Sequence, residues 1–186
     1  MNVSEAIRGR VSVKEYEPEP VSREQIEELL ELANLAPNHR MTEPLHFRVL
    51  GEGAKGAYAE ALAGRKTKKL DDADAAAMVR EKVMRRHMRV PAMVGVLVEQ
   101  DADPEVREED YATAFMAIQN LSLAAVEMGL GTHIKTGAVM DEPSLREALG
   151  VGEAQRLVAI VFLGMPAEMP DAKRRVPATE RTRWLD

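Results

Sequence analysis

Three polar side chains near the start of the chain are spaced so that they could hold an anion together. They are Arg10, Ser12 and Lys14, at alternate positions of one short segment. Alternate side chains of an extended segment share one face. Two cations with a hydroxyl between them suit a phosphate group, because each can make a charge-assisted hydrogen bond to it. Taken alone, this spacing is more typical of a solvated polar edge, so a phosphate site needs support from elsewhere in the chain.

A second group of cations, Lys173, Arg174 and Arg175, lies near the other end of the sequence. Taken alone it is more typical of a charged tail than of an anion clamp. The charge distribution along the chain gives the anion-clamp interpretation more weight. The whole chain has a formal net charge of −6, yet residues 1–14 carry +2 and residues 173–186 carry +3, which leaves −11 on the rest. A net negative charge argues against general nucleic-acid binding, whereas two basic ends could meet at one anion.

The remaining motifs predict little chemistry of their own. His39 stands in a loop of residues 36–40, and a lone loop histidine is more often a surface residue than a ligand or base. The four histidines have no metal-binding spacing, so no metal site is expected. The basic run 80–89 is typical of the solvated face of an amphipathic helix. RNA binding is the weaker alternative, because the run has no aromatic side chains for stacking.

Residues 51–56 match the dinucleotide-binding pattern G-x-G-x-x-G. They follow a predicted strand and open a predicted helix, and Asp71 and Asp72 lie where a ribose-binding acid would stand. A βαβ unit, however, needs a second strand soon after the helix, and none is predicted before Ala92. We therefore interpret this segment as a glycine-rich turn that ends a strand.

Length and composition predict a single domain over residues 1–186. The chain has no cysteine, which excludes disulfides, zinc knuckles, iron–sulfur clusters and thiol nucleophiles. The absence of cysteine also suits a reducing compartment, and we expect a cytoplasmic protein. No apolar run approaches the roughly 20 residues needed to cross a bilayer, and no signal peptide is apparent, so no membrane partner is expected.

The elements that must position these residues are predicted from periodicity and capping. Ser22 and Gln25 form a capping box that begins a helix, and Pro37 ends it. Further helices are predicted over residues 54–62, 73–89, 107–128 and 141–149, and residues 64–70 are expected to be irregular. Strands are predicted over residues 45–50, 92–98, 132–135 and 157–163. The result is a helix-rich mixed chain with about four strands.

Taken together, these segments resemble the nitroreductase family of flavin enzymes over nearly the whole chain. Residues 10–16 are similar to the family's opening motif Arg-Arg-Ser-Val-Arg-x-Phe, and the helix from Ser22 to Pro37 is similar to the next family helix, which ends in Ala-Pro. Residues 36–40 followed by Pro44 resemble the compact branch typified by the small bacterial YdjA-like enzymes. Residues 129–132, 135–137 and 163–166, with Lys173 and Arg175, are similar to the family's segment beside the flavin and to its closing segment.

The resemblance implies an α+β fold of the nitroreductase type, with a central, mostly antiparallel sheet flanked by helices. It also implies an intertwined homodimer that binds FMN at its interface. Arg10, Ser12 and Lys14 would hold the FMN phosphate, and Lys173 or Arg175 would close on it. Leu35 and His39 would contact the flavin across the interface. The full set of implied cofactor-binding residues is Arg10, Val11, Ser12, Lys14, Leu35, His39, Ile134, Lys135, Thr136, Lys173 and Arg175.

Three residues depart from the family pattern. Val11 replaces the second arginine of the opening motif and weakens any role that residue had. Leu45 replaces the tryptophan that usually follows the loop proline, and Ile134 stands where the compact branch tends to have tryptophan. Both replacements are expected to change the space available to a substrate.

The resemblance implies that NAD(P)H passes hydride to flavin N5 and that the electrons then go to a small-molecule acceptor, such as a nitroaromatic or a quinone, in ping-pong fashion. The flavin would carry the chemistry. No side chain is assigned a catalytic role, and Lys135 would stabilise the anionic reduced flavin. Two other classes stay open: a non-catalytic or sensory flavin-binding protein, which NAD(P)H would not reduce quickly, and a helical interaction protein without a cofactor, which would be colourless.

Overall fold

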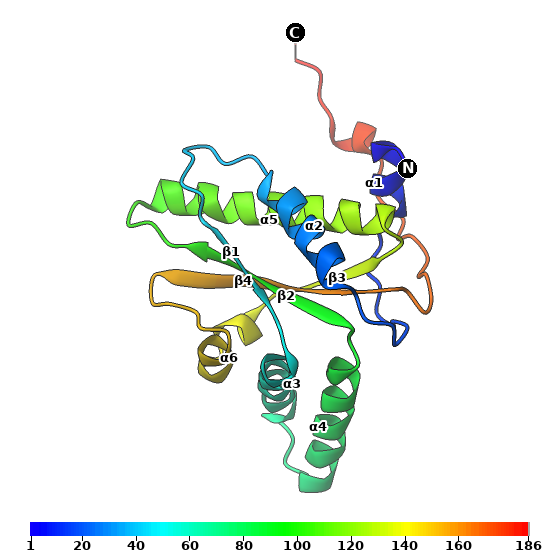
Figure 1. The fold of residues 1–186 in the computed structure, drawn as a ribbon, viewed down its shortest axis with the longest axis vertical. Helices are drawn as coiled ribbons and strands as arrows, with labels where there is room; N and C mark the ends of the chain where they lie inside the picture. The colour runs from blue at the N-terminus through cyan, green and yellow to red at the C-terminus, as the bar shows by residue number, and fades with distance from the viewer. Residues whose placement is uncertain (186) are drawn as a thin grey trace.

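The computed structural model describes residues 1–185 and places a four-stranded sheet between two layers of helices (Figure 1). The strands are β1 (Leu45–Val49), β2 (Ala92–Glu99), β3 (Gly131–Lys135) and β4 (Gln155–Gly164). Their order is β1-β2-β4-β3, and all three neighbouring pairs are antiparallel. The predicted α+β fold with a central antiparallel sheet is therefore confirmed.

One face of the sheet is covered by α2 (Arg23–Asn34) and α5 (Pro104–Glu127), with α1 (Val3–Gly9) packed beside α5. The capping box of Ser22 begins α2 as predicted. Small residues let α5 lie close to the strands, as Ala117 and Leu121 are fully buried against Val94 and Val161. This layer and the sheet enclose the larger of two apolar cores.

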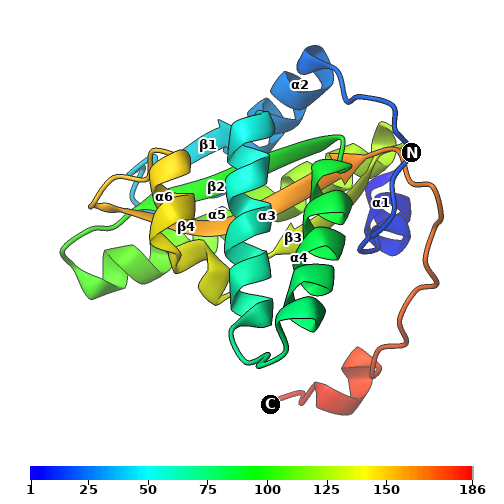
Figure 2. The ribbon, with the colours of Figure 1, turned by 90° about the horizontal axis from the view of Figure 1, so that it is seen from below.

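The opposite face is covered by α3 (Glu52–Thr67), α4 (Ala73–Met88) and α6 (Pro143–Ala148), together with a short 3₁₀ helix, η1 (Ala138–Asp141) (Figure 2). Its core includes Tyr58 of α3, Met93 of β2, Leu145 of α6 and Ile160 of β4, all buried. Because helices cover both faces, β2 and β4 are apolar along nearly their whole length instead of alternating.

Two helix boundaries differ from the prediction. Residues 64–67, expected to be irregular, continue α3, because Arg65 and Lys66 are good helix formers and their charges favour the carboxyl end of a helix. Helix α5 begins at Pro104, earlier than expected. Proline needs no hydrogen-bond partner at the first helical position, and the Asp103 carboxylate accepts the Glu105 N–H at 2.9 Å.

The glycine-rich segment 51–56 forms the start of α3. Gly51 is the N-cap of that helix, and Gly53 and Gly56 lie inside it. The strands on either side of α3 and α4 are β1 and β2, and they pair antiparallel. This is not the parallel βαβ arrangement that a dinucleotide fingerprint requires. The segment is also not the turn predicted above, because all of it except Gly51 is helical.

Beyond β4 the chain continues along the surface as an arm, residues 165–185, which first pairs with residues 15–17 and ends in a segment that extends away from the sheet (Figures 1 and 2). Only a 3₁₀ turn, η2 (Ala178–Arg181), interrupts it. Trp184 near its end is 93% exposed. Across residues 1–185, no helix combines the length and the apolar character that a membrane span requires.

Candidate functional site

The segment proposed to hold a phosphate lies along the free edge of strand β3. Ser12 pairs with Thr132 in a parallel bridge, and the Val13 N–H donates to the Thr132 carbonyl at 2.9 Å. The close approach depends on Gly131, where an added Cβ would lie 2.5 Å from a Val13 methyl carbon. The segment is thus extended, and Val13 points into the core while Ser12 and Lys14 remain exposed.

A cavity of about 700 Å³ opens between this segment, β3, and helices α3 and α4. Three of the residues predicted to bind a cofactor line it: Lys14, Lys135 and Thr136. Its volume lies within the usual range for small-molecule sites. The cavity therefore joins the two predicted segments, residues 12–14 and 135–136, that lie far apart in the sequence.

Aromatic rings form part of the cavity wall. Tyr58, His87 and Phe162 contact one another edge to face, with ring centroids 5.5 to 5.7 Å apart. Burial lowers the pKa of His133 to about 4, with the nearby Lys135 charge as the second cause. Neutral imidazole at ordinary pH makes this wall suitable for a flat apolar ring.

The rest of the lining is strongly cationic. Burial is the main cause of the lowered pKa of Lys135, and the charges of Arg86 and Lys66 lower it further. An anion bound here would relieve that repulsion. The cations of the lining are Lys14, Lys66, Lys82, Arg85, Arg86, Arg89 and Lys135, and Glu15 is the one carboxylate among the lining residues within the described part of the chain.

Glu15 offsets only part of this charge, since it pairs with Arg86 at 2.7 Å. Aromatic walls beside unbalanced cations are the environment that an aromatic, phosphate-bearing ligand requires. The residues present therefore fit FMN, whose ring is flat and whose phosphate is an anion.

The other predicted residues lie outside this cavity in a single copy of the chain. The Arg10 N–H closes the last turn of α1, donating to the Ala6 carbonyl at 2.9 Å immediately before the β3-edge segment. Val11 lines a separate cavity of about 110 Å³. Ile134 packs with the core on the other face of the sheet from Lys135. Lys173 and Arg175 lie on the exposed arm.

Leu35 and His39 lie on the helical face formed by α2 and α5. Leu35 is the C-cap of α2, is 75% exposed, and lines a shallow groove of about 460 Å³ between α1, α2 and α5. His39 is exposed in the loop of residues 36–44 that follows. One copy therefore does not bring these two residues to the cationic cavity.

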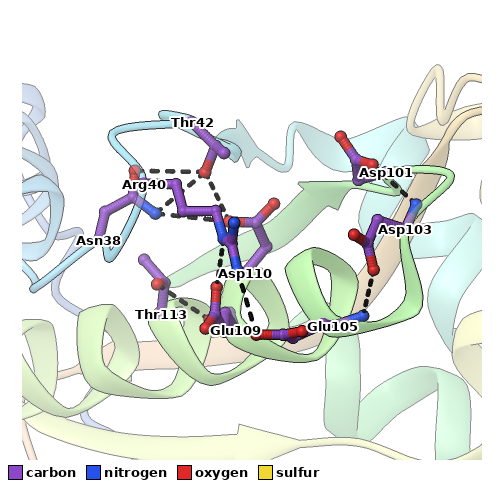
Figure 3. Close-up of polar contacts among 9 residues, drawn as sticks. All are labelled: Asn38, Arg40, Thr42, Asp101, Asp103, Glu105, Glu109, Asp110 and Thr113. Carbon is purple, nitrogen blue, oxygen red and sulfur yellow. Dashed lines mark hydrogen bonds and ion pairs between the residues drawn. The ribbon is translucent and has the colours of Figure 1, made fainter.

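The loop that carries His39 is fixed to α5 by polar contacts (Figure 3). The Asp110 carboxylate is buried and accepts hydrogen bonds from the Thr42 hydroxyl at 2.5 Å and the Asn38 amide at 3.4 Å. Arg40 pairs with Glu109 at 2.9 Å and with Glu105 at 3.1 Å. These contacts hold a strained backbone, because the non-glycine residues at positions 41 and 43 have φ of 50° and 47°.

Sequence reasoning missed the contribution of α3 and α4 to the cavity. Positions 82, 85, 86 and 89 of the basic run are exposed, as the interpretation of a solvated face predicted, and they also line the cavity. Their spacing of three and four residues places them on one side of a helix. That spacing is visible in the sequence, but nothing in it says that this side faces an opening and not bulk water.

Fold and site together define an α+β protein with a cavity suited to a flavin nucleotide at the edge of its sheet. The sequence pattern described as the nitroreductase family matches residues 7–165. The chain belongs to the nitroreductase family, and the resemblance found in its sequence is confirmed.

Individual relatives agree with this assignment. The chain is 34% identical over 179 residues to YfhC of Bacillus subtilis strain 168, covering 94% of this chain and 90% of the relative. It is 29% identical over 173 residues to YdjA of Escherichia coli strain K12, covering 92% and 91%. Both are named as candidate NAD(P)H nitroreductases. A solved nitroreductase-like family protein from Bacillus cereus has a TM-score of 0.86 at 29% identity, covering 100% of this chain and 97% of that one.

Proposed function

We propose that this chain is an FMN-dependent oxidoreductase that takes reducing equivalents from NAD(P)H and delivers them to a nitroaromatic, quinone or similar small acceptor by a ping-pong sequence. Its membership of the nitroreductase family and the names of its relatives support the general class, a flavin-dependent oxidoreductase. The observation that carries the proposal is the cavity beside β3, where aromatic walls and unbalanced cations meet. When bound, FMN supplies the redox chemistry.

The protein's own residues would bind and orient the cofactor. Ser12 and Lys14 would hold the phosphate with Arg10, because the three stand at alternate positions of the chain where it meets the β3 edge, and Lys14 lines the cavity. Lys135 and Thr136 would lie beside the ring. Negative charge that develops on reduction would be stabilised by Lys135, whose ammonium is already crowded by other cations.

We propose that the working form is a homodimer and that the second copy completes the site. Leu35 and His39 lie away from the cavity of their own copy, on a face that also exposes Val3 and Ile7. The apolar groove between α1, α2 and α5 is suited to burial against a partner. In a dimer, these residues and the arm carrying Lys173 and Arg175 would reach the cavity of the other copy.

The absorbance spectrum of the purified protein tests the proposal directly. We expect a flavin spectrum, FMN as the flavin released on denaturation, and rapid bleaching by NAD(P)H under anaerobic conditions. Bound flavin that NAD(P)H does not bleach would favour a passive or sensory flavin-binding protein. A colourless protein that takes up no added FMN would refute the proposal.

The phosphate assignment is tested by Arg10→Ala. We expect this variant to lose FMN on gel filtration while it remains dimeric, because one charge-assisted contact contributes about 1.5–3 kcal/mol. Arg8→Ala is the matched control, since Arg8 is an exposed residue of the same short helix, α1. An Arg10→Ala protein that retains FMN as well as Arg8→Ala would contradict the assignment.

A further inference from the structure

Three cations of α4 and the cation at its C-cap, Arg89, form a continuous row on the side of the helix that faces the cavity. Lys82, Arg85, Arg86 and Arg89 follow one another at intervals of three, one and three residues, and all four line the cavity. The row spans about two helical turns, roughly 10 Å. It lies opposite the β3 edge, where Lys14, Lys135 and Thr136 form the other side of the cavity.

Carboxylates neutralise this row only in part. Arg86 pairs with Glu15 and Arg85 with Glu81, the latter at 3.0 Å between exposed side chains. Lys82 and Arg89 have no carboxylate within 4.0 Å in residues 1–185. By contrast, Arg80 of the same helix does not line the cavity and is paired with Glu60 of α3. The unneutralised charge is therefore confined to the cavity side of α4.

FMN leaves much of this charge unmatched. Its phosphate carries about −2 at neutral pH, and of its proposed contacts, Arg10, Ser12 and Lys14, only Lys14 lines the cavity. Seven lining cations face one lining carboxylate. A cavity with this excess is suited to a second polyanionic ligand that enters after FMN is bound.

The two nicotinamide donors differ in charge at one place. Both carry a diphosphate, and NADPH alone has a 2′-phosphate, which adds about −1.5 to −2 at pH 7 if it titrates like other phosphomonoesters. Guanidinium groups match phosphate oxygens in a bidentate manner. A row of cations about 10 Å long can contact a diphosphate and a 2′-phosphate of one molecule at the same time.

We propose that Lys82, Arg85 and Arg89 bind the phosphates of the dinucleotide donor and that they make NADPH the preferred donor over NADH. This inference rests on the proposed function, because it assigns the donor of the same site. It places the nicotinamide end toward β3 and the adenosine phosphates along α4. The row on α4 would thus determine which of the two donors the enzyme prefers.

The variants Lys82→Ala, Arg85→Ala and Arg89→Ala test the inference, with Arg80→Ala as the matched control. We expect kcat/KM for NADPH to exceed that for NADH in the unmodified enzyme. Arg85→Ala and Arg89→Ala should each lose roughly tenfold or more in kcat/KM with NADPH and only about threefold or less with NADH. Lys82→Ala should lose kcat/KM with both donors, because the diphosphate is common to them. The loss should lie mainly in KM, and Arg80→Ala should behave like the unmodified enzyme.

A binding measurement separates this inference from the proposed function. Calorimetric titration uses adenosine 2′,5′-bisphosphate as the probe and 5′-AMP as its control, and needs no flavin turnover. We expect the bisphosphate to bind more tightly than 5′-AMP and to lose that advantage in Arg85→Ala and Arg89→Ala. If the protein takes up no FMN, the proposed function fails, while this titration still decides whether α4 binds a 2′-phosphate.

Three results would overturn the inference. In the first, kcat/KM falls equally for the two donors in Arg85→Ala and Arg89→Ala, which would assign no 2′-phosphate contact to these residues. In the second, the variants lose FMN, which would mean that the row holds the flavin itself. In the third, the bisphosphate and 5′-AMP bind the unmodified protein equally.

Discussion

At the scale of single residues, Asp110 links the loop of residues 36–44 to the core. Its buried carboxylate accepts hydrogen bonds from Thr42 and Asn38 of the loop. Asp110→Ala removes the charged acceptor and leaves the Thr42 hydroxyl and the Asn38 amide N–H with only each other as partners. We therefore expect the free energy of unfolding to fall by about 1–3 kcal/mol. Urea denaturation measures the change. Glu105→Ala is the control, because Glu105 is 73% exposed and its ion pair with Arg40 contributes about 1 kcal/mol or less. Equal effects of the two substitutions would contradict this account.

His133 predicts a dependence of stability on pH. In the folded protein its pKa is about 4, mainly because it is buried and then because Lys135 is close, whereas an unperturbed histidine titrates near 6.5. Between these values the unfolded chain binds more protons, so stability is fully present above about pH 6.5 and is lost as the pH falls toward 4. His133→Gln should flatten this part of the curve, measured by urea denaturation between pH 4 and 7.5. An unchanged slope would show that His133 is not the titrating group.

At the scale of elements, the docking of residues 12–16 on β3 positions the candidate site. Gly131→Ala would place a methyl group 2.5 Å from Val13, and such overpacking costs about 1–3 kcal/mol. Because Ser12 and Lys14 would shift with Val13, we expect FMN retention to fall as well. Gly56→Ala is the control, and its expected effect on stability has the opposite sign. Nothing lies within 4 Å of the added Cβ inside α3, so this change should stabilise the protein by up to about 1 kcal/mol. Thermal unfolding and flavin retention measure both.

Capping residues and apolar periodicity predicted most of these elements, and they failed at one end of α3 and one end of α5. The Ser22 capping box and the apolar run of β2 appear in the structure at the expected residues. The continuation of α3 through Lys66 was missed, because a charged segment is as compatible with a helix end as with a loop. The Asp103-Pro104 pair is a helix-start signal in the sequence. The helix was predicted from apolar periodicity, which indicated a later start.

The sequence likewise predicted some residues of the candidate site and missed others. Alternation within residues 10–14 predicted that their polar side chains share one face, and only the family resemblance assigned them to a phosphate. The structure places Lys14 in the cavity with Lys135. The cations of α4 were not assigned to the site, because only the packing of α4 against α3 brings them to an opening. Ile134 is the opposite case, a residue that was assigned to the site but that lies outside the cavity. It adjoins Lys135 in sequence, yet strand alternation turns it to the other face of the sheet.

In the whole molecule, the arm of residues 165–185 would contact the second copy of the proposed dimer and contribute to its site. No residue from 173 to 185 belongs to either apolar core, and Lys173 and Arg175 are exposed in a single copy. Removing residues 173–186 should therefore leave the circular dichroism spectrum of the folded chain intact. It should weaken both dimerisation and FMN retention, as measured by analytical ultracentrifugation and by flavin absorbance.

Two full-length double variants separate the roles of charge and apolar surface in the arm. Lys173→Ala with Arg175→Ala should remain dimeric and lose FMN, because only the phosphate contacts are removed. Trp184→Ala with Leu185→Ala should weaken the dimer, since these side chains are 93% and 90% exposed in one copy and burying such a side chain against a partner contributes about 1.5–3 kcal/mol. If the truncated chain stays dimeric and keeps its FMN, the arm does not reach the partner's cavity. The phosphate would then be held by the residues of the β3 edge alone.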